Sequence, residues 1–159
     1  MSNLALSLCD CERFAEAAEV IAAHDPLYRQ QRGARWRVKE SVLRGRVACG
    51  LGRSDEAEEL FRAARDGALA LEDYFSAALA SLDLATLYLE QRRLPELREV
   101  ASLLAPALDA HDLRQEAIAA LLLFTRAAFA EELTVEAVRR LRWSLESGGR
   151  TATQPAPAS

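Results

Sequence analysis

The sequence predicts an all-α protein built from repeated helix pairs, and three observations support this fold class. Ala and Leu dominate the 159 residues, whereas Gly and Pro number only 7 and 5. Ala, Leu, Glu and Arg lose little side-chain freedom in a helix, so this composition favours helices. A short segment also recurs every 40 residues. Amphipathic stretches of helical length separate most of its copies.

The recurring segment consists of a Glu and the residue that follows it. Its four copies are Glu16-Ala17, Glu56-Ala57, Glu96-Leu97 and Glu136-Ala137. Each copy is predicted to begin a helix, because a carboxylate in the first turn complements the positive end of the helix dipole. Regular internal repeats of this length are typical of helical arrays, in which stacked units share a core.

The predicted helices pair as 2–9 with 12–24, 34–50 with 54–67, 73–91 with 95–109, and 113–131 with 134–147. Ser54 and Thr134 are expected to cap their helices, and Pro95 suits a first helical position. The turns between pairs are predicted at Asp25-Pro26, Asp66-Gly67 and residues 109–112.

One helix pair resembles the tetratricopeptide repeat consensus, through Gly45, Gly52, Asp55, Glu56, Ala57, Phe61 and Ala64. The next unit keeps Leu84, Ala85, Tyr88 and the Pro95-Glu96 start, and the outer units keep Ala17 and Ala137. The resemblance covers roughly residues 2–147 and implies a right-handed α-solenoid of about four antiparallel helix pairs. Units of about 40 residues are longer than the family's 34, as in the solenoid domains of large bacterial signalling and transcription regulators. A HEAT-like array, with units of about 40 residues, is the alternative.

The expected organisation is one helical-repeat domain at residues 1–147, followed by a disordered tail or linker at 148–159. The tail is expected because this segment is rich in Thr, Pro and Ala. The first unit is short compared with the others, so the chain is expected either to begin with a half-helix or to be a segment of a larger protein.

Several function classes are disfavoured by the sequence. The longest apolar run, residues 117–124, is too short to span a membrane, and no signal peptide is visible. Three cysteines are expected to be reduced thiols in a cytoplasmic protein. Cys9, Cys11 and His24 lack the second half of a zinc motif, so no metal and no cofactor are predicted. The sequence shows no phosphate-binding loop and no catalytic constellation, so we do not expect an enzyme.

Positive charge is concentrated in one segment of a chain whose net charge is −4. Residues 26–54 hold eight basic residues and one acid. The basic side chains recur at helical spacing and include Arg32, Arg35, Lys39, Arg46 and Arg53. The family resemblance implies that Lys39 and Arg46 face a concave groove that binds an acidic peptide or helix. The alternative is a solvated face that pairs with acids of a neighbouring unit. Nucleic acid is disfavoured, because the chain is acidic and aromatic residues do not interleave with the basic ones.

The resemblance also places four apolar residues on the groove side, namely Leu82, Leu89, Leu122 and Phe129. Burial in the core is the alternative for them, and the run from Leu121 to Phe124, apolar on every side, favours it.

The resulting hypothesis is a non-catalytic protein–protein interaction module that binds a peptide or an amphipathic helix in its groove. The alternative is a structural or sensory segment of a larger regulator, in which the helical array transmits a signal or self-associates.

Overall fold

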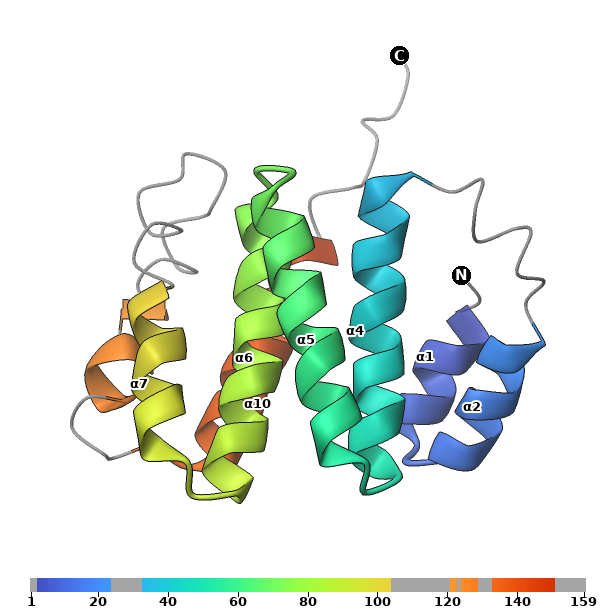
Figure 1. The fold of residues 1–159 in the computed structure, drawn as a ribbon, viewed down its shortest axis with the longest axis horizontal. Helices are drawn as coiled ribbons and strands as arrows, with labels where there is room; N and C mark the ends of the chain where they lie inside the picture. Colours follow the sequence, from blue (N-terminus) through green and yellow to red (C-terminus); the bar gives the residue numbers. More distant parts are fainter. Residues whose placement is uncertain (1–2, 24–32, 104–120, 123, 129–132, 151–159) are drawn as a thin grey trace, which may run out of the picture.

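The computed structural model describes residues 3–23, 33–103, 121–122, 124–128 and 133–150, and the structural statements below concern these residues alone. Their regular secondary structure is α-helical, without a strand, as the sequence predicts. The helices are α1 (Asn3–Asp10), α2 (Phe14–Ala22), α4 (Ala34–Gly50), α5 (Ser54–Leu69), α6 (Tyr74–Glu90), α7 (Leu94–Leu103) and α10 (Val135–Arg150) (Figure 1). Residues 121–122 and 124–128 are also helical.

Local signals in the sequence locate some helix ends and miss others. The Thr134 hydroxyl accepts a hydrogen bond from the Ala137 amide at 3.2 Å, which confirms it as a cap. Ser54 is not a cap but the first residue of α5, because the preceding turn already places Arg53 at the N-cap. Asp66-Gly67 lies inside α5 instead of forming a turn, since the surrounding alanines continue the helix to Leu69.

Asp73 supplies a cap that the sequence analysis did not identify. Its carboxylate accepts hydrogen bonds from the amide of Ser76 at 3.1 Å and from the Ser76 hydroxyl at 2.9 Å. Two predicted boundaries, Asp25-Pro26 and residues 109–112, lie outside the described residues. At the other end of the described chain, α10 continues past the predicted boundary at residue 147 to Arg150.

The same turn follows α1, α4, α5 and α6. In each case one residue has a left-handed backbone, at Glu12, Gly52, Glu72 and Arg92. The amide of the next residue donates to a carbonyl five residues earlier, at 2.8 to 2.9 Å. This pattern is the Schellman motif, which satisfies the last carbonyls of a helix. The turns at 12, 52 and 92 therefore give the 40-residue repeat a backbone basis.

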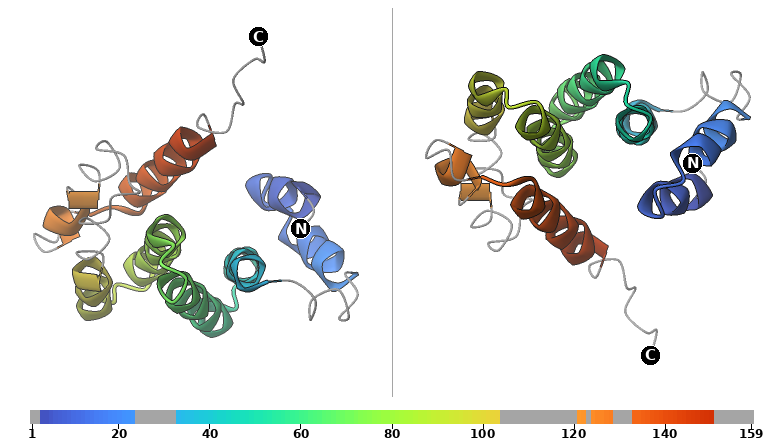
Figure 2. Two further views of the ribbon diagram at one scale, coloured as in Figure 1. Left: turned by 90° about the horizontal axis from the view of Figure 1, so that it is seen from above. Right: turned by 90° about the horizontal axis from the view of Figure 1, so that it is seen from below.

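Successive helices pack side by side, and α6 lies at the centre of the molecule (Figure 1). It contacts α5 and α7, the helices that precede and follow it, and also α4 and α10. Both views in Figure 2 place α10 on the side of α6 that faces away from α5. More than half of the 17 residues of α6 are consequently buried. The packing of α10 against α6 positions the candidate site described next.

Close helix contacts depend on small residues. Ala57 is fully buried where α5 meets its neighbours, and the ring of Phe61 lies against Gly45 of α4. A Cβ atom at position 45 would lie only 2.5 Å from Cε1 of Phe61, so glycine is required for this approach. Phe61 and Tyr88 belong to the main core cluster.

Candidate protein-binding face on α4, α6 and α10

The basic residues expected on one side of α4 divide into exposed and paired side chains. Arg35 and Lys39 are exposed, and Arg46 is half-buried. Their spacing of four and seven residues places them on one side of the helix. Arg32 lies outside the described residues. We call Arg35 and Lys39 the basic stripe.

Arg46 contacts acids that come from two other helices. Its Nη2 donates to Oε1 of Glu146 on α10 at 3.1 Å. Its Nε lies 3.9 Å from Oδ1 of Asp83 on α6. For this residue the structure therefore shows pairing with acids distant in sequence, which was the alternative to a groove-facing role.

Arg46 belongs to a four-residue charge cluster with Asp83, Arg142 and Glu146. The Nε of Arg142 lies 2.6 Å from Oδ1 of Asp83, and its Nη2 donates to Oδ2 at 3.0 Å. The Nη1 of Arg142 also lies 2.8 Å from Oε2 of Glu146. Two arginines and two carboxylates thus link α4, α6 and α10. We call this group the interhelix cluster.

Burial determines the electrostatics of the interhelix cluster. It raises the pKa of Asp83 to about 7, an effect that the charge of Arg46 opposes and that of Glu146 reinforces. A carboxylate removed from water depends on nearby positive charge to remain ionised. Arg142 is itself only 8% exposed, so it in turn depends on Asp83 and Glu146. The charge of Arg46 therefore favours the ionised form of Asp83, whereas burial disfavours it.

Of the four apolar residues expected on the groove side, the three that the structure describes differ widely in exposure. Leu82 is fully buried and has no exposed surface with which to contact a partner. Leu89 is partly buried against the same core. Leu122 is 46% exposed, and Phe129 lies outside the described residues. Leu82 belongs to the main core cluster, as do Val138 and Leu145 of α10.

One edge of α10 carries a residue that the sequence analysis did not single out. Trp143 is 68% exposed, the most exposed large hydrophobic side chain in the described residues. It is four residues after Arg139 and three before Glu146, so the three share an edge of the helix. Arg139 pairs with Glu90 of α6 at 2.9 Å, and Glu146 reaches α4. The signal in the sequence was an aromatic residue within the polar sector of an amphipathic helix.

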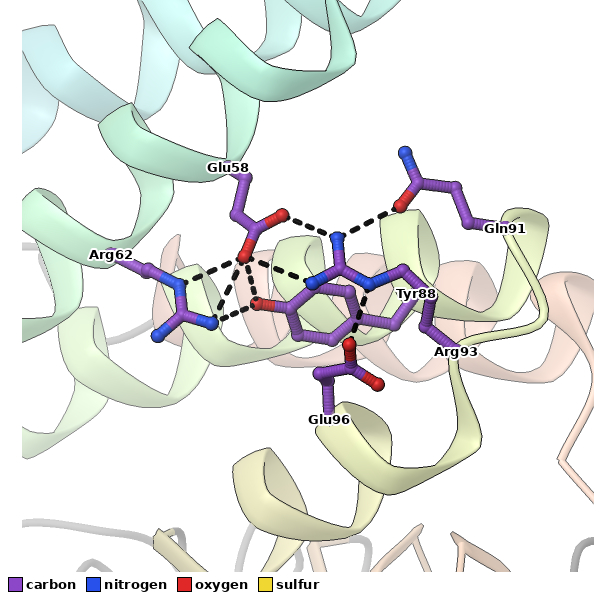
Figure 3. A network of polar contacts seen from close by, with 6 residues as sticks. All are labelled: Glu58, Arg62, Tyr88, Gln91, Arg93 and Glu96. Carbon is purple, nitrogen blue, oxygen red and sulfur yellow. Dashed lines mark hydrogen bonds and ion pairs between the residues drawn. The ribbon is translucent and has the colours of Figure 1, made fainter.

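A second polar network joins α5, α6 and α7 around Glu58 (Figure 3). The carboxylate accepts from the Tyr88 hydroxyl at 2.9 Å and from Nη1 of Arg93 at 2.5 Å, and it pairs with Arg62 at 3.0 Å. Arg93 also lies over the Tyr88 ring, 4.7 Å from its centroid. Arg93 further donates to Glu96 at 2.8 Å. These contacts fix three successive helices relative to one another.

Arginines pair both with Glu58 and with the Glu that recurs every 40 residues. Burial raises the pKa of Glu58, but hydrogen bonds from Arg93, Tyr88 and Arg62 outweigh it, and the net shift is downward. Arg93 donates to Glu96 three residues later, and Arg53 pairs with Glu56 and Arg13 with Glu16 at the same spacing. Each recurring Glu in these three turns therefore has an arginine partner at the start of its helix.

Two of the three cysteines, Cys9 and Cys49, are poorly suited to nucleophilic or metal chemistry. Burial raises the pKa of the Cys49 thiol to about 11, and it also raises the pKa of Cys9. Protonated thiols are weak nucleophiles and weak ligands. Cys9 is buried and Cys11 is exposed, and both are free. His24 lies outside the described residues, among which no group of three metal-binding side chains occurs.

Within the described ranges, no helix has the length and apolar character needed to cross a membrane. Comparisons with protein families, with curated proteins and with solved structures give no match for this chain. Its function must therefore be argued from its own residues.

Proposed function

We propose that this chain is a non-catalytic protein-interaction module of the cytoplasm, in which a right-handed tetratricopeptide-like array of antiparallel helix pairs binds an acidic peptide or helix. The observation that carries the proposal is the basic stripe of α4 beside Arg46. Among the described residues, no carboxylate lies within ion-pair distance of Arg35 or Lys39. Arg46, on the same side of α4, already pairs with a carboxylate presented by another helix.

The chemistry of the partner follows from this side of α4. An acidic segment lying along the helix would meet two exposed cations in succession, four residues apart. Such exposed charges add modest affinity but steer association and select the sign of the partner. We assign no catalytic step, because the acids with lowered pKa values are held by arginines and burial keeps Cys9 and Cys49 protonated.

Charge reversal on two sides of α4 tests this proposal. Arg35→Glu/Lys39→Glu alters the basic stripe. Arg37→Glu/Arg44→Glu is the matched control, because these exposed arginines lie on the opposite side of the same helix. Each protein is immobilised, exposed to cell extract at low and high salt, and compared by mass spectrometry and thermal melting.

The expected result is a set of acidic proteins retained by the wild type and the control but lost by the stripe variant, at unchanged melting temperature. Retention should weaken with added salt, since exposed charges are screened over about 8–10 Å at physiological ionic strength. Equal retention of acidic proteins by both variants would show that the basic stripe does not contribute to binding.

A second candidate function is self-association as a segment of a larger regulator, and the exposure of Trp143 favours it. A largely exposed Trp is a typical interface residue. Sedimentation at increasing concentration tests this: Trp143→Ser should abolish a dimer that the wild type forms. A wild type that remains monomeric at all concentrations would exclude this candidate.

A further inference from the structure

The contact between α10 and the rest of the molecule differs in chemistry from the contacts within the repeated helices. Three apolar residues of α10, Val138, Leu141 and Leu145, pack against the main core. Beside them, Arg142 and Glu146 enter the interhelix cluster. A buried salt-bridge cluster therefore lies next to a narrow apolar stripe.

The interface between α4, α5 and α6 is filled by residues such as Ala48, Phe61 and Ala78, all buried in the main core. Its polar network, around Glu58, is more exposed: the side chains of Arg62 and Arg93 are 38% and 33% exposed, whereas those of Asp83 and Arg142 are each 10% exposed. Burying an ion pair returns little net stability, because the cost of desolvation offsets the attraction between the charges. A helix that lacks the matching charge is strongly disfavoured, because it leaves the other charge of the pair buried without a partner. The attachment of α10 is therefore selective rather than strong.

The face of α4 and α6 beneath α10 has a defined order of charges. Arg46 requires an acid, Asp83 requires a base, and the core residues against which Val138, Leu141 and Leu145 pack require apolar cover. The α10 sequence meets these demands with apolar residues at 138, 141 and 145, a base at 142 and an acid at 146. An amphipathic helix with this spacing carries the same groups on one side.

We propose that α10 is an exchangeable occupant of this face, and that a partner protein binds by presenting a helix of the same chemistry in its place. The partner helix carries a base followed four residues later by an acid, with apolar residues four before and three after the base. This proposal rests on the proposed interaction function and names the class of ligand. Charge complementarity with Arg46 and Asp83 identifies the occupant.

The test uses the full chain and a labelled synthetic peptide that spans residues 133–150. In the wild type the tethered α10 competes with the peptide at a high effective concentration, so binding should be weak. Val138→Ala/Leu145→Ala weakens α10 while leaving α4 and α6 unchanged. Fluorescence anisotropy should give a dissociation constant for this variant at least tenfold lower than for the wild type.

Two controls make the measurement specific. Arg140→Ala/Ser144→Ala changes exposed residues of the same helix and should bind the peptide as weakly as the wild type. A peptide with Arg142→Ala and Glu146→Ala should bind the weakened variant at least tenfold less tightly than the native peptide does. Adding Asp83→Asn to the weakened variant should have a similar effect.

Amide exchange on the weakened variant distinguishes exchange from unfolding. Slow exchange in α4–α6 together with tight peptide binding supports the proposal. Loss of protection in α6 would show that α10 is required for folding, and would overturn it. A folded variant that fails to bind the peptide, or that instead forms a dimer, would also overturn it.

The peptide experiment does not depend on the basic stripe. Peptide binding that persists in an Arg35→Glu/Lys39→Glu background, with loss of the acidic proteins, would support both proposals. If only the peptide fails to bind, the exchange of α10 is overturned and binding by the basic stripe is not. If only the capture of acidic proteins fails, binding by the basic stripe is overturned and the exchange of α10 is not.

Discussion

At the scale of single residues, the four left-handed turn positions differ in how well their side chains suit the backbone. Gly52 adopts φ +74° without strain, whereas Glu12, Glu72 and Arg92 adopt similar values with a Cβ atom present. A left-handed conformation of a non-glycine residue costs free energy, because the Cβ atom approaches the backbone. Glycine would therefore suit the backbone better than the exposed side chains that occupy three of these positions.

Replacing Glu72 with Gly should stabilise the protein. The gain should be about 0.5–1 kcal/mol, the strain that is relieved less the added flexibility of the unfolded chain. Urea denaturation measures the free energy of unfolding. Gly52→Ala is the reciprocal change and should cost about 1 kcal/mol. A loss of stability in Glu72→Gly would show that the Glu72 side chain contributes more than its backbone strain costs.

Gly45 should tolerate no side chain. In Gly45→Ala the new methyl group meets the Phe61 ring, and the overpacking should cost about 1–3 kcal/mol despite the better helix propensity of Ala. Gly67→Ala is the comparison, because its Cβ would meet only a Val38 methyl group at 3.2 Å. Thermal melting should place Gly45→Ala clearly below Gly67→Ala. Equal melting temperatures would contradict the close approach of α4 and α5.

Residue identity predicted burial better than it predicted helix ends. The fully buried state of Ala57 and Tyr88 follows from their positions in the repeat. The end of α5 was misplaced because Asp66-Gly67 is a turn signal that the surrounding alanines override. Helix propensity summed over a segment outweighs one weak breaker.

At the scale of helices, the Glu58 network is the main polar connection between α5, α6 and α7. A carboxylate with several donors prefers its ionised state. Because the pKa of Glu58 in the folded protein lies below the ordinary value of 4.5, its contribution to stability is present above that pH. This contribution is lost as the pH falls through the pKa of the folded state.

Glu58→Gln should therefore reduce the free energy of unfolding at neutral pH, and should also reduce the loss of stability that occurs as the pH falls. At neutral pH the free energy of unfolding should fall by about 1–2 kcal/mol, since hydrogen bonds to a charged acceptor are replaced by weaker ones. Below about pH 4.5 the difference from the wild type should shrink. Glu59→Gln, an exposed neighbour on the same helix, is the control. A constant difference across the acid range would contradict the ionised state of Glu58.

The contact between α6 and α10 should behave as a coupled pair. Asp83→Ala and Arg142→Ala should each cost about 3 kcal/mol, because each leaves a buried charge without its partner. A double-mutant cycle should give a coupling energy of about 1–3 kcal/mol. The exposed pair Arg139 and Glu90 joins the same two helices and should couple by less than about 1 kcal/mol. Equal coupling in the two cycles would contradict the burial of the interhelix cluster.

The sequence predicts that α10 exists and that it is amphipathic. It does not predict where α10 packs. Nothing local in residues 135–150 specifies that they pack against α6 rather than only against the preceding helix of their own unit. That choice depends on contacts such as Arg142 with Asp83, 59 residues apart. The expectation that Leu82 lines a groove did not take account of its full burial in the core.

At the scale of the whole molecule, the composition and the 40-residue period predicted the all-α class, which the described residues confirm. The turns reveal a finer step, because the left-handed residues at 52, 72 and 92 are 20 residues apart. One helix and one Schellman turn form this step. It was hidden in the sequence, because only Gly52 of these turn residues is a glycine.

Amide hydrogen exchange should follow the burial of the helices. We expect the slowest exchange in α6, which is covered by neighbours on several sides, and faster exchange in α2, where only Ala17 is buried. Mass spectrometry of peptic fragments measures both in one experiment. Equal protection of α2 and α6 would contradict the central place of α6.

The cover that α10 provides has a consequence for synthesis on the ribosome. Chains grow from the N-terminus, so α6 emerges well before the helix that covers it. In that interval the Asp83 carboxylate is without Arg142, and the same helix of a nascent chain on a neighbouring ribosome is an alternative partner for it. Translation speed between residues 90 and 135 therefore sets how long this face stays open during the synthesis of each molecule.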